Sequence, residues 1–145
     1  MSRRSDNEDY SSALGTLTRK QVQDAIRRGN SLVRADIRGV DLNGISFENV
    51  DLSGAKLAES NLSQCNFVGA NLSNASMWHA NLKDACFDRA TMEGTDLDFA
   101  YLDGCTIKGA WIKKAIFPLA RISMDEILDA VKTGQRLRMS SPGHD

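Results

Sequence analysis

Three cysteines and two histidines are the side chains of this 145-residue sequence best suited to covalent or metal chemistry. A cysteine beside a histidine can act as a nucleophile, because the imidazole takes up the thiol proton. Cysteines and histidines at short, regular spacings can instead hold zinc. Cys65, Cys86 and Cys105 match neither a zinc nor a redox spacing, and their odd number favours reduced thiols. His79 lies in the middle of the chain, and His144 lies near its C-terminus.

A five-residue ladder determines how these side chains are positioned. Every fifth residue from Leu32 to Phe117 is large and apolar, a period that fits neither a helix nor a plain strand. A second ladder of mostly small residues, from Ala35 to Ala115, lies two places earlier, often with Asp or Asn between the two. Inward residues at spacing two indicate a short extended segment. Glycines such as Gly54 then indicate turns, so the pattern predicts short sides joined by corners.

Residues 34–118 resemble the pentapeptide-repeat family, whose motif is A-(D/N)-L-x-x, as in Ala80-Asn81-Leu82. The resemblance implies an all-β fold, a right-handed quadrilateral parallel β-helix with four pentapeptides per coil and about four coils. Stacked repeats of this kind bury their core only against neighbouring repeats, so both ends of the solenoid need caps.

Coils of twenty residues place four large residues in one inward column: Phe47, Phe67, Phe87 and Ile107. Rings stacked on like rings fill such a column at native density, which supports the twenty-residue coil independently of the resemblance. Cys65 and Cys105 become small inward residues two coils apart. That separation is about 9–10 Å, too long for a disulfide.

Capping signals predict a short helix at each end of the solenoid. Thr18 with Gln21 forms a capping box, and Ser123 with Glu126 forms another. The predicted organisation is a disordered tail over 1–16, an N-terminal capping helix over 17–29, the β-helix over 30–118, a C-terminal capping helix over 119–134 and a mobile tail over 135–145.

The C-terminal helix carries apolar residues at helical spacing: Met124, Ile127, Leu128 and Val131. We expect this stripe to cover the end of its own solenoid. A homodimer through the same helix is the alternative, because the resemblance implies relatives that often dimerise through their C-terminal ends.

The four-sided register argues against catalysis. Cys86 is the one cysteine predicted to point outward, but it falls on the side opposite His79, so the two cannot form a dyad. No set of histidine, cysteine and carboxylate side chains converges, and the glycines have no phosphate-loop spacing. We therefore expect a protein that is not an enzyme, with no catalytic residue, cofactor or metal.

Composition narrows the range of partners. A formal net charge of −1 argues against direct binding of nucleic acid. No run approaches the about 20 apolar residues that a membrane span needs, and the first ten residues lack the apolar region of a signal peptide. We therefore expect a cytoplasmic protein that has no membrane partner.

Exposed aromatic residues mark the candidate partner site. The register places Trp78, His79 and Phe99 on the outside of one face, with Tyr101 round the corner. Clustered exposed aromatics on a small domain suggest a binding site, here for a protein partner of unknown identity. The alternative is that these rings pack only on one another or on a tail. Trp111, on a different face, is expected to lie beneath the C-terminal helix.

Acidic residues favour a competing function. The resemblance implies relatives that confer quinolone resistance by imitating DNA and binding gyrase, which requires a long acidic stripe. Here the solenoid from 36 to 118 has 11 acidic and 7 basic residues, a net of −4. Its densest acids form a ring over all four faces: Asp84, Asp88, Glu93, Asp96, Asp98 and Asp103. A DNA-mimicking regulator of gyrase or another topoisomerase is therefore the alternative to a rigid interaction module.

Overall fold

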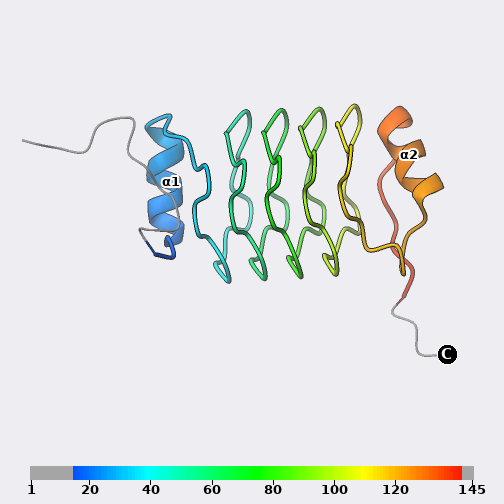
Figure 1. Ribbon diagram of the computed structural model, residues 1–145, viewed down its shortest axis with the longest axis horizontal. Coiled ribbons are helices and arrows are strands. Elements are labelled where there is room, and N and C mark those ends of the chain that lie inside the picture. The colour runs from blue at the N-terminus through cyan, green and yellow to red at the C-terminus, as the bar shows by residue number, and fades with distance from the viewer. Residues whose placement is uncertain (1–14, 142–145) are drawn as a thin grey trace, which may run out of the picture.

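The computed structural model describes residues 15–141, so predictions that concern residues 1–14 and 142–145 lie outside the described part. Helix α1 (Arg19–Arg27) lies at one end of a stack of coils, and helix α2 (Met124–Thr133) lies at the other end (Figure 1). The coils between them have the same size and orientation, so the solenoid is straight and even.

Isolated parallel β-bridges hold the coils together. Each bridge joins residues twenty positions apart, and one run on a single face links Asp36, Lys56, Ser76, Asp96 and Ile116. The predicted twenty-residue coil is thereby confirmed. Along residues 15–141 the pairing stays at single residues and no continuous strand forms, because each side turns a corner after one bridge.

Each corner is a tight turn closed by a hydrogen bond. The N–H of Ala70, for example, donates to the Phe67 carbonyl at 3.0 Å. The residue just before the N–H donor has a positive φ, 69° at Gly69. A Cβ atom at Gly69 would overlap the side-chain oxygen of Asn49 one coil below, so a larger residue there would have to displace the Asn49 side chain.

The predicted aromatic column forms the centre of the core. Phe47 and Phe67 stack with ring centroids 5.1 Å apart, and Phe67 and Phe87 stack at 4.9 Å, both pairs inclined by only 4°. Ile107 continues the column and is buried. Close parallel rings match the coil spacing of about 4.8 Å, so the column and the backbone share one repeat.

Four inward positions hold a polar or sulfur side chain that donates to a carbonyl 23 residues earlier. They are Ser60, Cys65, Thr95 and Cys105. The Cys65 and Cys105 thiols lie 3.0 Å and 2.9 Å from their acceptors. Burial raises the pKa of Cys65 to about 11 and raises that of Cys105 further, so both thiols stay protonated. Their predicted role as small core residues is confirmed.

Helix α1 begins as the sequence predicts. The Thr18 hydroxyl accepts from the Gln21 N–H at 3.2 Å, while the Gln21 side chain accepts from the Thr18 N–H at 2.9 Å. Val22 and Ala25 are buried against the first coil. The Arg19 guanidinium also donates to two backbone carbonyls of that coil, which fixes the helix on the open end.

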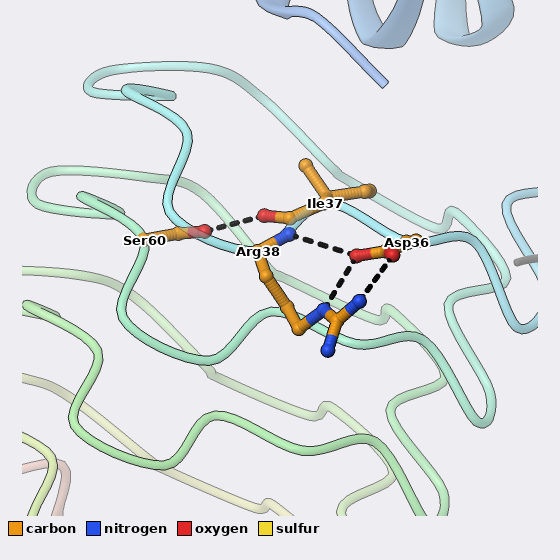
Figure 2. A network of polar contacts seen from close by, with 4 residues as sticks. All are labelled: Asp36, Ile37, Arg38 and Ser60. Atoms are coloured by element: carbon orange, nitrogen blue, oxygen red, sulfur yellow. Dashed lines mark hydrogen bonds and ion pairs between the residues drawn. The ribbon is translucent and has the colours of Figure 1, made fainter. Parts of the chain in front are cut away.

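An ion pair in the first coil joins the buried carboxylate of Asp36 to the exposed guanidinium of Arg38. The Arg38 guanidinium makes two hydrogen bonds to Asp36, of 2.8 Å and 2.7 Å, and the Arg38 N–H makes a third of 3.3 Å (Figure 2). These bonds lower the pKa of Asp36 below its usual range, although burial opposes the shift. The Ser60 hydroxyl donates to the Ile37 carbonyl beside this pair, so the first two coils are joined there.

Helix α2 differs in two details from the prediction. The Ser123 hydroxyl caps the Glu126 N–H at 3.1 Å, but Glu126 accepts from that hydroxyl instead of from the Ser123 backbone, so the reciprocal half of the capping box is missing. The predicted apolar stripe also divides. Ile127 and Ala130 are buried and Val131 is half-buried, whereas Met124 and Leu128 face solvent. Ala130 lies outside the predicted stripe, so the covered face of α2 runs through Ile127 and Ala130 and leaves Met124 and Leu128 on the open side.

A mobile tail was predicted for 135–145, but residues 135–141, the described part of this segment, are docked on the last coil. Leu137 is buried, and its N–H donates to the Cys105 carbonyl at 2.8 Å. The Leu137 carbonyl accepts from the Gly104 N–H, also at 2.8 Å. Because the last coil has no successor, the segment docks on backbone groups that another coil would otherwise pair. A single buried leucine has no periodicity, so the sequence did not reveal it.

Candidate partner-binding surface

Three aromatic side chains gather on the outside of the solenoid. The rings of Trp78 and His79 meet edge to face with centroids 4.0 Å apart, and His79 stacks on Phe99 at 5.0 Å. Trp78 and Phe99 are 6.3 Å apart. Even so, 62% of Phe99 and 40% of Trp78 remain exposed. We call Trp78, His79 and Phe99 the aromatic patch.

The backbone under the patch is the left-handed corner that recurs along the solenoid. His79 and Phe99 are corner residues one coil apart, and both have a φ of 58°. This conformation favours glycine, and Gly39 occupies the same corner two coils before His79, with Glu59 between them. Eight other non-glycine residues among 15–141 hold such a corner, so the coil itself accommodates side chains that point outward there.

Tyr101 does not join the aromatic patch. Its ring instead lies beneath the Arg121 guanidinium, whose central carbon is 5.7 Å from the ring centroid. Between the patch and Arg121 lies a groove of about 350 Å³, which also borders Met139. The groove is lined by His79, Asp98, Phe99, Ala100, Pro118, Ala120, Arg121 and Met139. The predicted four-residue cluster thus divides into the patch and a Tyr101–Arg121 pair across a groove.

Arg121 and Met139 are residues that the sequence did not predict for this surface. They lie in the loop before α2 and in the segment after it, outside the five-residue ladder. No spacing links them to Phe99, because only the return of the chain over the last coil brings them close.

Trp111 contradicts the expectation that it lies beneath the C-terminal helix. It is 56% exposed, and its indole N–H donates to the Glu93 carboxylate at 3.1 Å. Trp111 stands immediately before the apolar centre Ile112, a position whose side chain points away from the core.

The acidic ring is largely engaged in local hydrogen bonds. The Asp96 carboxylate accepts from the Asp98 N–H at 2.9 Å, and the Asp98 carboxylate accepts from the Phe99 N–H at 3.1 Å. Asp88 accepts from the Lys108 N–H at 3.0 Å. Asp103 accepts from the Met139 N–H at 3.1 Å and lies 3.8 Å from Arg138. Together with Glu93, five of the six predicted acids therefore stabilise turns or side chains. Asp84 is the exposed member of the six.

The two kinds of site considered from the sequence, a cysteine–histidine pair and a metal-ligand cluster, can be located on the structure. Cys86 lies on the face of Phe87, two sides away from the face of Met77 that ends in His79, which agrees with the predicted separation. Among residues 15–141, no group of three histidine, cysteine, aspartate or glutamate side chains is placed to hold a metal ion. Neither described helix is long and apolar enough to cross a membrane.

Comparisons with known proteins show which family model and which solved structures the chain matches. A family model described as pentapeptide repeat region matches residues 28–117, and no curated protein matches the chain significantly. A pentapeptide repeat protein from the Arabidopsis thaliana thylakoid lumen is 32% identical to this chain, with a TM-score of 0.55. The match covers 55% of each chain, so this chain spans only about half the length of the Arabidopsis protein.

Two further structures are less similar. A pentapeptide repeat protein from Nostoc PCC 7120 is 25% identical over 79% of this chain and 93% of its own, with a TM-score of 0.42. QnrB1, a plasmid-mediated fluoroquinolone resistance protein, is 19% identical over 61% of this chain and 46% of its own, with a TM-score of 0.29. The right-handed β-helix is the fold class that the structural neighbours support. With its family model covering more than half of the sequence, the chain belongs to the pentapeptide-repeat family.

Proposed function

We propose that the protein is a non-catalytic interaction module that presents the aromatic patch to a protein partner. One observation carries the proposal: Trp78, His79 and Phe99 gather on one face of the solenoid and remain exposed, with 62% of Phe99 open to solvent. Contacts within the patch bury little of Phe99, so packing in the fold gives weak reason for an aromatic ring at this position.

The patch has the composition of an interface centre. Tryptophan and other aromatic residues are enriched among residues that dominate binding, because large rigid rings lose little entropy when they are covered. Trp78, His79 and Phe99 also project from a stacked core, which holds them in a fixed arrangement before any partner arrives.

Affinity capture with patch variants tests the proposal. The double variant Trp78→Ser, Phe99→Ser should lose a partner that the unchanged protein captures from its own cells, while its circular dichroism spectrum stays the same. Trp111→Ser is the matched control, since Trp111 is similarly exposed on another face. Capture that survives in the double variant, or that is lost equally in the control, rejects the patch as the binding site.

The gyrase alternative is a competing proposal with less support from the charges. Five ring acids already accept hydrogen bonds from the protein itself, and the charge is spread around the solenoid. A supercoiling assay with purified gyrase tests it directly, and inhibition or protection of the enzyme at excess protein would favour the DNA-mimic function over the interaction module.

A homodimer through α2 also remains a proposal. Met124 and Leu128 are the exposed apolar residues that a second copy would cover. Light scattering of the pure protein distinguishes a dimer from a monomer, and Leu128→Glu should convert the former to the latter.

A further inference from the structure

The last coil of the solenoid is covered on only part of its open end. Its inward residue Ile107 is buried, but Ile112 and Ala115, which also occupy inward positions, are only half-buried. The residues one coil below them, Met92 and Thr95, are fully buried. Inward side chains of a solenoid are covered by the neighbouring coils, so the exposure at Ile112 and Ala115 marks the side where the last coil lacks a cover.

Helix α2 lies across this end of the stack and has two different flanks (Figure 1). On one flank, Glu126 and Asp129 line a pocket together with the segment after α2. Ile127 points at the coil and is buried. Met124 and Leu128 are four residues apart and therefore share the other flank, where they are 40% and 49% exposed.

The exposed flank of α2 faces the uncovered side of the coil. The segment after α2 covers the side around Cys105, and α2 ends over the next corner, where the Val131 carbonyl accepts from the Gly109 N–H at 2.9 Å. Because that segment lies against one flank of the helix, the opposite flank faces the remaining side of the coil, where Ile116 is also 50% exposed. We call the apolar residues on this side the apolar end: Ile112, Ala115, Ile116, Met124 and Leu128.

Lysine side chains surround the apolar end. Lys113 and Lys114 lie between Ile112 and Ala115 in the chain, and Lys132 follows Leu128 by about one helical turn. All three lysines are exposed, and none of them forms an ion pair with a carboxylate among the described residues. Exposed apolar residues with a rim of cations indicate an interaction surface for an anionic partner.

Charge is segregated along the solenoid. Residues 36–107 contain 11 acidic and 4 basic residues, a net of −7, whereas residues 108–141 contain 3 acidic and 7 basic residues, a net of +4. An anionic surface would attract the C-terminal end and repel the body of the solenoid, so it would orient the molecule end-on. A second copy joined symmetrically at the same end would place like charges opposite one another, which disfavours that occupant.

The N-terminal end provides an internal comparison. Residues 15–35 contain 5 basic residues and 1 acidic residue, but no large apolar side chain is exposed in this range. Five of the eight exposed large apolar side chains among residues 15–141 lie instead near the C-terminal end: Trp111, Ile116, Leu119, Met124 and Leu128. Both ends are basic, and the C-terminal end alone combines its charge with exposed apolar residues.

We propose that the apolar end docks on an anionic lipid surface. Its exposed side chains enter the boundary between headgroups and acyl chains, while the surrounding lysines pair with the anionic headgroups. Lysine suits this partner because its compact charge needs no fixed acceptor geometry, whereas arginine is the residue that suits fixed carboxylate pairs at protein interfaces. A surface contact needs no membrane-spanning segment, so it is compatible with the short apolar runs of the sequence. We therefore revise the expectation that the protein has no membrane partner.

Co-sedimentation with vesicles tests the inference. The full chain is mixed with vesicles of equal parts phosphatidylcholine and phosphatidylglycerol, or with vesicles of phosphatidylcholine alone. We expect binding to the anionic vesicles only, and weaker binding as the salt concentration rises. The double variant Lys113→Gln, Lys114→Gln should bind more than about tenfold more weakly, because each basic residue near an anionic surface contributes about fivefold. Leu128→Ser should also weaken binding severalfold, because it removes apolar area that the lipid covers.

A matched charge control uses the other end of the solenoid. The double variant Lys20→Gln, Arg28→Gln also removes two exposed charges, but it should change the affinity by less than about twofold. The two ends are separated by the whole stack, which is longer than the Debye length of about 8 Å. Equal losses in the two double variants would show attraction by total charge and would overturn the inference.

The remaining outcomes identify other occupants of the apolar end. Binding that is lost in the Lys113→Gln, Lys114→Gln variant but unchanged in Leu128→Ser would be a contact through charge alone, as with an acidic protein, and overturns lipid docking. Absence of binding to either kind of vesicle also overturns it. If light scattering then shows a dimer that Leu128→Ser converts to a monomer, a second copy is the occupant.

The aromatic patch is tested separately. The double variant Trp78→Ser, Phe99→Ser should bind anionic vesicles like the unchanged protein, because it leaves the apolar end and its lysines intact. Loss of partner capture with unchanged vesicle binding supports both surfaces. Partner capture that survives in this variant rejects the patch but leaves lipid docking in place, so the two proposals can fail independently.

Discussion

Replacing Phe99 by glycine should leave the free energy of unfolding nearly unchanged, although it removes a whole aromatic ring. Relief of the left-handed backbone at φ 58° gains about 1–2 kcal/mol. Glycine is more flexible in the unfolded chain, which costs about 0.5–1 kcal/mol. Loss of the stack on His79 costs about 0.5–1.5 kcal/mol. Since 62% of Phe99 is exposed, little further burial is lost, and the net change should stay within about 1 kcal/mol.

Urea denaturation followed by circular dichroism measures this change. Phe99→Gly should shift the midpoint by only a small amount, whereas affinity for a partner should fall, so stability and binding separate. A loss of more than about 2 kcal/mol would refute the reasoning. Phe99 would then be a structural residue, and its exposed ring would no longer point to binding.

Three other substitutions test the account of the fold. Phe67→Ala, which removes the middle ring of the stacked column, should cost about 3–5 kcal/mol in urea denaturation, and a cost below about 2 kcal/mol contradicts the column. Asn30→Val removes a buried amide whose oxygen and nitrogen have no partner among the described residues, so it should raise the free energy of unfolding by about 1–3 kcal/mol. A decrease would show that the amide is hydrogen-bonded. Asp36 has a lowered pKa, so it stabilises the fold above its ordinary pKa of 3.8, and this contribution is lost as the pH falls through the lower, folded value. When the free energy of unfolding is followed as the pH is lowered, Asp36→Asn should therefore lose less of it than the unchanged protein does. Identical acid profiles for the two proteins would contradict the Arg38 pairing.

The repeat itself made most of the fold predictable. A five-residue period with inward pairs at spacing two permits few architectures, and the aligned phenylalanines set the number of residues in a coil. The bridges at spacing twenty and the stacked rings confirm both points. Thr18 and Gln21 likewise specify the start of α1, because the capping box is a local interaction.

Two errors concern residues outside the ladder. Leu137 is buried because the last coil lacks a successor, and no local pattern in its polar surroundings shows this. Met124 and Leu128 have helical spacing, yet the covered face of α2 runs through Ile127 and Ala130 and leaves them exposed. Spacing predicts which residues share a helix face, and only packing determines which face is covered.

The candidate site was predictable only in part. Trp78, His79 and Phe99 follow from the register, because outward positions of adjacent coils must lie close together. Arg121 and Met139 reach the same groove from segments without a repeat.

Photo-crosslinking in living cells tests the central claim, that the aromatic patch contacts a protein partner, most directly. A benzophenone-bearing phenylalanine analogue replaces Phe99 in one variant and the equally exposed Trp111 in another. The account predicts a discrete adduct of higher mass on irradiation with the analogue at position 99, and none at position 111. An adduct at position 111 alone, or no adduct at either position, would contradict it.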